Sequence, residues 1–215
     1  MPPTHQWKRA HERLNADITK AAKRKNLPFR SITDLINTNE RYPSLIPVLI
    51  DWLKNLENKS GLTQPTELHD LRDGLYRALT TVDAMGTEAV SLLFDSFYLQ
   101  PPAPPIILAT IGTALRYIAA PADYVRMRQV ATDRSLSFGR APLIEWLLRA
   151  DPDDALPLAV SELDDPSVRP YILRSLRAIK HLPASLRSVI EPYLDDPDSE
   201  VRLQAKRTLA KLARD

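Results

Sequence analysis

Residues 163–182 read LDDPSVRPYILRSLRAIKHL, and residues 194–212 read LDDPDSEVRLQAKRTLAKL. Both stretches open on the same four letters, at a step of 31 residues. After a two-residue insertion in the second copy, a Val-Arg pair follows in each, and Arg174 falls on Arg207. The chain therefore contains one structural unit at least twice.

The repeated unit has the pattern of a helix that begins after a sharp turn. Apolar residues at positions 168, 172, 176 and 179 recur every three or four places, which is the stripe of an amphipathic helix. Asp-Pro precedes the stripe, and because proline cannot continue a helix while acidic residues favour a helix N-terminus, the dipeptide separates two helices. Each unit is predicted to be a helix, a tight turn and a second helix.

The rest of the chain divides into similar pairs, and a period of 20–50 residues is typical of a solenoid. The pairs are YPSLIPVLIDWLKNLE with TELHDLRDGLYRALTTV, TEAVSLLFDSFYL with PPIILATIGTALRYIAA, and ADYVRMRQVATD with SFGRAPLIEWLLRA. With five glycines and no alternating run bounded by turns, a sheet is not expected. We predict an all-α chain, an α-solenoid of about five helical pairs after an N-terminal helix. Pro47 and Pro157 lie early in the first helix of a pair, where proline either bends a helix or marks its first turn.

The final two units resemble HEAT repeats, in which a short acidic turn precedes the second helix, and the chain is similar to small bacterial HEAT-repeat proteins. The residues that carry the likeness are Asp165, Val168, Arg169, Asp198, Val201 and Arg202. The likeness is good across 151–215 and weaker across 42–150, where the acidic turn is missing. It implies a right-handed superhelix whose second helices line a concave side. It also implies a structural ladder in which turn aspartates bind second-helix arginines, here Asp165, Asp198, Arg169 and Arg202.

Charge separates the N-terminus from the rest of the chain. Residues 1–30 carry a net charge of +6, so residues 31–215 carry −4 of the total of +2. We expect 1–30 to form a basic helical segment packed on a single repeat domain, 31–215. We interpret the segment as a solvated amphipathic helix in which Trp7, Leu14 and Ile18 pack at helical spacing. The alternative is a basic arm that touches phosphates.

No motif for catalysis, cofactors or metals is present. The chain has no cysteine, no P-loop, no dinucleotide-binding or nucleophile-elbow motif, and four histidines without metal-ligand spacing. The acidic run at 151–154 lacks the glycine and the distal glutamate of a calcium loop. With no apolar run long enough to span a membrane and no secretory signal, the cytoplasm is the expected compartment. We predict no enzyme activity, no cofactor, no metal and no membrane contact.

Arginines and tyrosines outside the apolar stripes are the candidate binding residues, because these two residue types dominate interface hot spots. The predicted binding residues are Arg72, Tyr76, Arg77, Arg116, Tyr117, Arg140, Tyr171, Arg174 and Arg177, and Arg149 has the same character. The alternative for any one of them is that its stem covers the stripe or that it pairs with an acid.

Three functions fit these features to different degrees. The first is a protein-binding module, with the immunity-type inhibitor of a toxin domain as the specific form that small bacterial HEAT-repeat proteins suggest. The second is a nucleic-acid-binding protein resembling HEAT-like DNA glycosylases, which the basic N-terminus favours and the charge of −4 on the remainder opposes. The third, a pigment-handling lyase of the helical-repeat kind, lacks a candidate nucleophile or acid.

Overall fold

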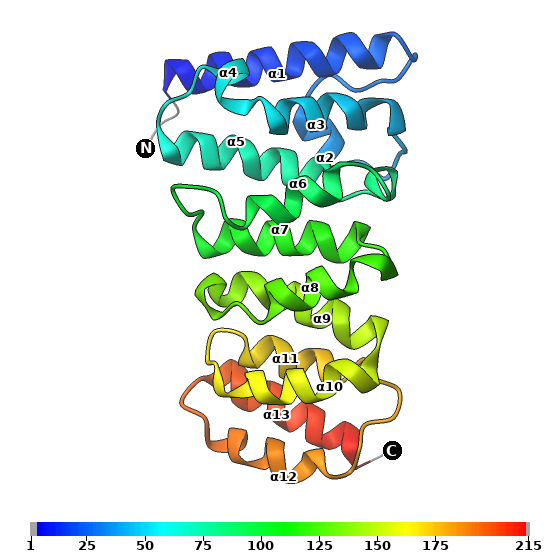
Figure 1. Ribbon diagram of the computed structural model, residues 1–215, viewed down its shortest axis with the longest axis vertical. Helices are drawn as coiled ribbons and strands as arrows, with labels where there is room; N and C mark the ends of the chain where they lie inside the picture. The colour runs from blue at the N-terminus through cyan, green and yellow to red at the C-terminus, as the bar shows by residue number, and fades with distance from the viewer. Residues whose placement is uncertain (1–3, 214–215) are drawn as a thin grey trace. The chain divides into compact units, whose positions relative to one another are not determined.

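The computed structural model describes residues 4–213, which contain thirteen α-helices, six short 3-10 helices and no strand (Figure 1). The prediction of an all-α chain is confirmed. The chain divides into two compact units, unit 1 up to Ala120 and unit 2 from Pro121. No helix in the described residues is long and apolar enough to cross a membrane.

Unit 1 holds seven α-helices and two 3-10 helices. They are α1 (His5–Lys23), α2 (Ile32–Ile36), η1 (Pro43–Leu45), α3 (Ile46–Lys54), α4 (Leu56–Ser60), α5 (Pro65–Ala78), η2 (Val82–Ala84), α6 (Ala89–Ser96) and α7 (Pro105–Ile118). Figure 1 shows α1 beside α3 and α4, and α5 beside α7, as the contacts require.

Unit 2 holds the other six α-helices and four 3-10 helices. They are η3 (Pro121–Asp123), α8 (Tyr124–Ala131), η4 (Arg134–Arg140), α9 (Ala141–Ala150), α10 (Pro152–Ser161), η5 (Glu162–Asp164), α11 (Arg169–Leu176), α12 (Leu186–Ile190), η6 (Glu191–Asp195) and α13 (Ser199–Leu212). Helix α9 packs against α8, α10 and α11, and α11 packs against α13.

Proline determines where many of these helices begin. A proline occupies the first or second position of α3, α5, α7, α9, α10 and α11. The ring fixes φ near its helical value and the missing N–H has no helical acceptor at that position, so proline starts a helix without cost. Pro47 lies in the first turn of α3, whereas Pro157 lies inside α10.

Helix α1 is held on unit 1 by one apolar stripe. The stripe consists of Ala10, Leu14, Ile18 and Ala22, all fully buried. It packs on α3 and α4, and burial of Leu14 and Ile18 contributes about 1.5–3 kcal/mol each. The indole Nε1 of Trp7 also donates to Asp70 at 2.6 Å, which ties the first turns of α1 to α5. The helix is therefore anchored along its length.

In unit 2 the repeated Asp-Asp-Pro turns make the same contacts twice. The amide of Ser167 donates to Oδ1 of Asp165 at 2.8 Å, and the amide of Asp198 donates to Oδ1 of Asp196 at 2.9 Å. The second oxygen of each aspartate accepts from an arginine of the preceding unit. Arg140 donates to Asp165, and Arg169 donates to Asp196 at 2.7 Å.

Each of these arginines also binds backbone carbonyls of its own unit. Nη1 of Arg140 donates to Ala131 O at 2.8 Å, Nε of Arg169 donates to Leu163 O at 2.6 Å, and Nη1 of Arg202 donates to Asp196 O at 2.7 Å. Each guanidinium therefore binds the backbone of its own unit. The guanidinium groups of Arg140 and Arg169 also bind the turn aspartate of the next unit.

Two expectations about this ladder are corrected. Asp196, not Asp198, accepts from Arg169, because the two-residue insertion lies after the Asp-Pro turn and shifts Asp198 onto the helix. Asp198 instead caps α13 by accepting from the amide of Glu200 at 2.8 Å. Arg140, expected on a binding surface, is a ladder residue with a fully buried side chain.

Replacing Arg140 by methionine tests the ladder. Arg140→Met leaves the carboxylates of Glu162 and Asp165, 8% and 15% exposed, without their buried cation, and we expect a loss of about 3–5 kcal/mol in unfolding free energy. The matched control is Arg187→Met, because Arg187 pairs with Glu191 on the surface at 3.7 Å and such pairs contribute only about 0–1 kcal/mol. Urea unfolding at neutral pH, followed by circular dichroism, measures both. Equal losses in the two variants would contradict the ladder.

The same contact predicts an acid-dependent stability. Burial acts to raise the pKa of Asp165, but hydrogen bonds from Arg140 and the Ser167 amide outweigh it and hold the pKa below its usual range. The stability from ionised Asp165 is thus complete above the unfolded pKa of about 3.9 and is lost as the pH falls through the folded value. We expect Asp165→Asn to be less stable than the parent at neutral pH and the difference to narrow in acid. Unfolding free energies measured across this range check it; a constant difference would show that the carboxylate is not the stabilising form.

Candidate functional site

Three arginines gather on neighbouring helices of unit 2. Arg174 lies in the last turn of α11 and Arg177 is the C-cap residue that follows it, still in helical conformation, so the two side chains share one face. Thr208 donates to Leu173 O at 2.7 Å and Lys211 donates to Arg177 O at 3.1 Å, so α11 and α13 run side by side in the same direction. This register brings Arg207 of α13 against the pair. Arg174, Arg177 and Arg207 are called the arginine cluster.

The cluster is a site of like-charge repulsion. Burial first, and then the charges of Arg207 and Arg174, lower the pKa of Arg177, while Glu200 opposes them. Oε1 of Glu200 already accepts from Gln204 at 2.6 Å. Among residues 4–213, no carboxylate forms an ion pair with any of the three guanidinium groups. Within the cluster, Nε of Arg177 donates to Arg174 O at 3.4 Å. The fold therefore holds three cations together and leaves their other donors to a ligand.

An aromatic stack supports one edge of the cluster. The guanidinium of Arg174 lies 5.4 Å from the centre of the Tyr171 ring, and Phe138 stacks on that ring at 6.4 Å with an interplanar angle of 18°. Phe138 comes from η4, where Ser137 has φ 50° and ψ −141°, a strained conformation for a residue with a Cβ. This backbone conformation changes the chain direction between Leu136, which is buried, and Phe138, which lies beside the cluster.

The predicted binding residues are distributed differently from expectation. Tyr171, Arg174 and Arg177 come together, as their helical spacing predicts. Tyr76 and Arg140 do not lie on the surface, with exposures of 1% and 0%, so their assignment to a binding surface is corrected. Burial raises the pKa of Tyr76, whose hydroxyl lies beside Ser96.

The other predicted residues of unit 1 form no comparable cluster. Arg72 is mostly buried and pairs with Glu57 at 3.2 Å beside a hollow of about 340 Å³ between α4, α5 and α6. Arg77 is exposed and pairs with Asp73 at 3.8 Å. Arg116 is half-buried, and Tyr117 beside it is exposed. In unit 2, Arg149 pairs with Glu145 at 2.6 Å.

Arg207 is the site residue that the sequence-based set lacks. Its signal was present, because the two repeat copies align Arg207 with Arg174. The predicted residues were chosen helix by helix, from positions outside each apolar stripe. The cluster instead forms between equivalent positions of two helices. A polar residue that recurs at the same position of both repeat copies, outside the apolar stripe, is therefore a signal for a surface site.

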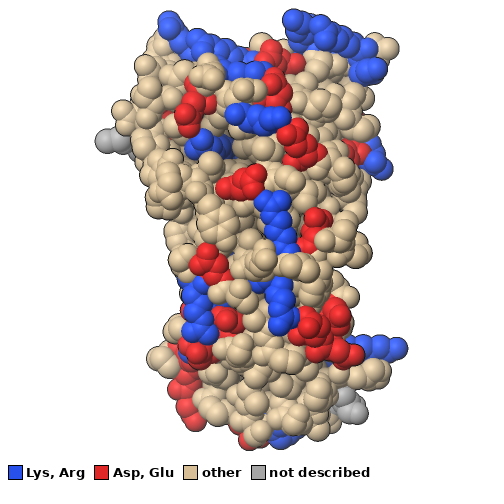
Figure 2. Space-filling view, in the orientation of Figure 1, with Lys and Arg blue, Asp and Glu red and all other residues tan. Residues whose placement is uncertain are grey.

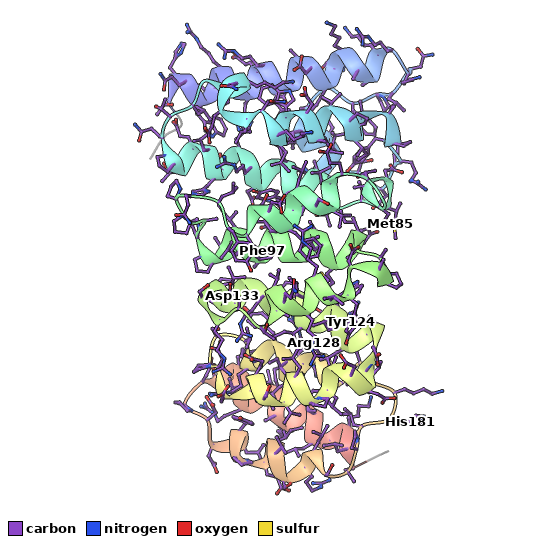
Figure 3. The ribbon with its side chains drawn as sticks, viewed as in Figure 1. Met85, Phe97, Tyr124, Arg128, Asp133 and His181 are labelled. Carbon is purple, nitrogen blue, oxygen red and sulfur yellow. The ribbon has the colours of Figure 1, made fainter. Side chains whose placement is uncertain are left out.

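A second polar group in unit 2 is satisfied internally. Tyr124 and Arg128 of α8 both donate to Asp154 of α10, Tyr124 at 2.6 Å (Figure 3). Burial, and then Asp154, raise the pKa of Tyr124 to about 12, so its hydroxyl stays a donor at neutral pH. Within the described part of the chain, no group of three or more His, Asp or Glu residues is placed to hold a metal ion.

Comparison of the chain with protein-family models, with curated proteins and with solved structures gives no match.

The repulsion in the cluster predicts a response to anions. Arg207→Gln removes one of the mutually repelling charges, so at low ionic strength we expect a higher melting temperature than that of the parent protein. A bound anion stabilises the folded state by RT ln(1 + [L]/Kd), so about 10 mM sulfate should raise the melting temperature of the parent more than that of Arg207→Gln.

Lys206→Gln is the matched control for this experiment. Lys206 is the exposed neighbour of Arg207, and its replacement removes the same charge. The control should show the same rise in melting temperature with sulfate as the parent does. Sulfate also stabilises folded proteins in general, and this effect cancels when the two variants are compared. An identical sulfate response in both variants would show that the cluster binds no anion.

Proposed function

We propose that the chain is a non-enzymatic protein-binding module whose arginine cluster takes the carboxylates of an acidic segment of a partner protein. The observation that carries the proposal is the set of three guanidinium groups without an ion-pair partner among the described residues, two of them exposed. Like charges held together cost stability, and an acidic partner converts that cost into binding energy.

Protein carboxylates fit this site better than an isolated small anion does. Guanidinium groups bind carboxylates through two parallel hydrogen bonds, and Tyr171 beside Arg174 adds a half-buried ring that can contact apolar atoms of a polypeptide. The stack of Arg174, Tyr171 and Phe138 limits the motion of these side chains before binding, which lowers the entropy lost on association.

We further propose that the scaffold is a HEAT-like α-solenoid. The support lies in unit 2, where Asp165 and Asp196 make equivalent contacts 31 residues apart and the helices that follow them, α11 and α13, pack side by side. In such a stack equivalent surface positions of successive units line up, which is the relation between Arg174 and Arg207. A dedicated inhibitor of the immunity type is the specific form of binder that this scaffold suggests.

A capture experiment with charge-reversed variants tests the function. The tagged protein, Arg174→Glu/Arg207→Glu and the control Lys180→Glu/Lys206→Glu are each exposed to nuclease-treated native lysate, and retained proteins are quantified by mass spectrometry. We expect one protein to be retained in equal amount by the parent and the control. Its affinity for the cluster variant should be weaker by about thirty-fold or more, since hot-spot arginines contribute about 2 kcal/mol or more.

Two outcomes would sink the proposal: no retained protein, or one that both variants retain equally. Inhibition of the partner's own activity at one-to-one stoichiometry would identify the module as an inhibitor. A partner that keeps its activity when bound would leave the binding function and remove the inhibitor role.

A further inference from the structure

The outward face of α1 carries a row of cations. At about 100° per residue, the direction opposite the buried stripe passes close to Arg9, Lys20 and Lys23, with Lys8 and Arg24 on its two sides. All five side chains are exposed. Figure 2 shows the Lys and Arg side chains gathered over this helix.

These cations are not neutralised within the protein. Among residues 4–213, none of the five forms an ion pair. The helix has two acidic residues, of which Asp17 accepts from the Trp52 indole at 2.9 Å and lies 3.8 Å from Lys59. Glu12 is the single acid left on the outward face. The charge is therefore available to a partner.

The row is rigid because α1 is anchored along its length. Besides the apolar stripe and the Trp7 bond, Nη1 of Arg13 donates to the carbonyls of Lys59 at 3.3 Å and Ser60 at 3.4 Å. At about 1.5 Å of rise per residue, Arg9 and Lys20 are about 16 Å apart along the axis, and Lys20 and Arg24 about 6 Å. A fixed row of this length suits a partner with regularly repeated negative charge.

The side chains on the outward face of α1 indicate which class of polyanion it can bind. None of the exposed large hydrophobic side chains in the described residues belongs to α1, and its apolar stripe is covered, so the helix has nothing to insert into a lipid layer. Single-stranded nucleic acids bind through stacking on aromatic side chains. Trp7 is the one Trp, Tyr or Phe residue of α1. Its ring lies against that of His11, tilted by 32° with the centroids 3.8 Å apart, and its indole donates to Asp70.

We propose that the outward face of α1 binds the phosphate backbone of double-stranded nucleic acid without reading its sequence. This surface belongs to unit 1 and is independent of the arginine cluster in unit 2. The lysines and arginines contact phosphates as point charges, and Glu12 is the single acid among the cations of this face. A helix that engages about four phosphates gives a slope of about −3.6 in log K against log salt concentration.

Fluorescence anisotropy with a labelled DNA duplex of mixed sequence, about 20 base pairs long, tests the proposal, with an RNA duplex as a second arm. We expect micromolar binding at low salt, the steep salt dependence given above, and little difference between sequences. Lys20→Glu/Lys23→Glu should weaken binding at low salt by about tenfold or more. Circular dichroism of the variant confirms that it remains helical.

The matched control is Lys180→Glu/Lys206→Glu, which changes the net charge from +2 to −2 just as the α1 variant does. It should bind the duplex more tightly than the α1 variant does, because its changes are in unit 2 and leave the cations of the row unchanged. An equal loss of duplex affinity in the two variants would show that only net charge matters. That result would overturn the assignment of the binding site to α1.

Three further results would overturn the proposal. They are the absence of duplex binding at low salt, loss of duplex binding in Arg174→Glu/Arg207→Glu instead of the α1 variant, and binding to phosphatidylserine vesicles with none to the duplex. Because the capture experiment uses nuclease-treated lysate and the cluster variant, its failure and failure here are distinguishable.

Discussion

The buried pairing of an arginine with the turn aspartate of the following unit is the contact on which the rest of unit 2 depends. Two pairs of opposite charge, Arg140 with Asp165 and Arg169 with Asp196, recur at equivalent positions of successive units. In each case the carboxylate also accepts a backbone amide and the guanidinium also donates to backbone carbonyls, so the buried charges are compensated at both ends. Such compensation is the condition under which a buried ion pair is tolerated at all. It fixes the turn, and the turn fixes where α11 and α13 begin.

Arginine has two opposed roles in this unit. In the ladder the guanidinium groups of Arg140 and Arg169 are paired and mostly buried, and the replacement of Arg140 is expected to destabilise the fold. In the arginine cluster the charges of Arg174 and Arg207 act unfavourably on Arg177, and the replacement of Arg207 is expected to stabilise the fold. The helices position both sets, since Arg169 and Arg174 lie on the same α11. A surface that lowers the stability of its own fold is a common mark of a binding site. The row on α1 differs from it, because its cations are spaced along one helix and are mainly lysines.

The sequence predicts helices better than it predicts partners. Proline positions and apolar periodicity give the helices, and the i, i+3 spacing of Arg174 and Arg177 gives two of the three residues of the cluster. Arg140 was misassigned because its aspartate lies 25 residues later, beyond any local pattern. The sequence pattern favours Asp198, which keeps the three-residue spacing to Val201, whereas the equivalent turn contacts are made by Asp196. The burial of Tyr76 depends on α6, whose Ser96 meets its hydroxyl. Errors of this kind arise where the packing between helices decides the environment of a polar group.

The most direct test of the division between paired and unpaired arginines is nuclear magnetic resonance of the arginine Nε–Hε groups, titrated with a short glutamate-rich peptide. Signals of Arg174 and Arg207 should shift together and saturate with a single affinity, while those of Arg140 and Arg169 stay in place. Substitution of each arginine in turn provides the assignments. Absence of any shift, or small unsaturated shifts spread evenly over all exposed arginines, would show that the cluster is an ordinary charged surface and not a binding site.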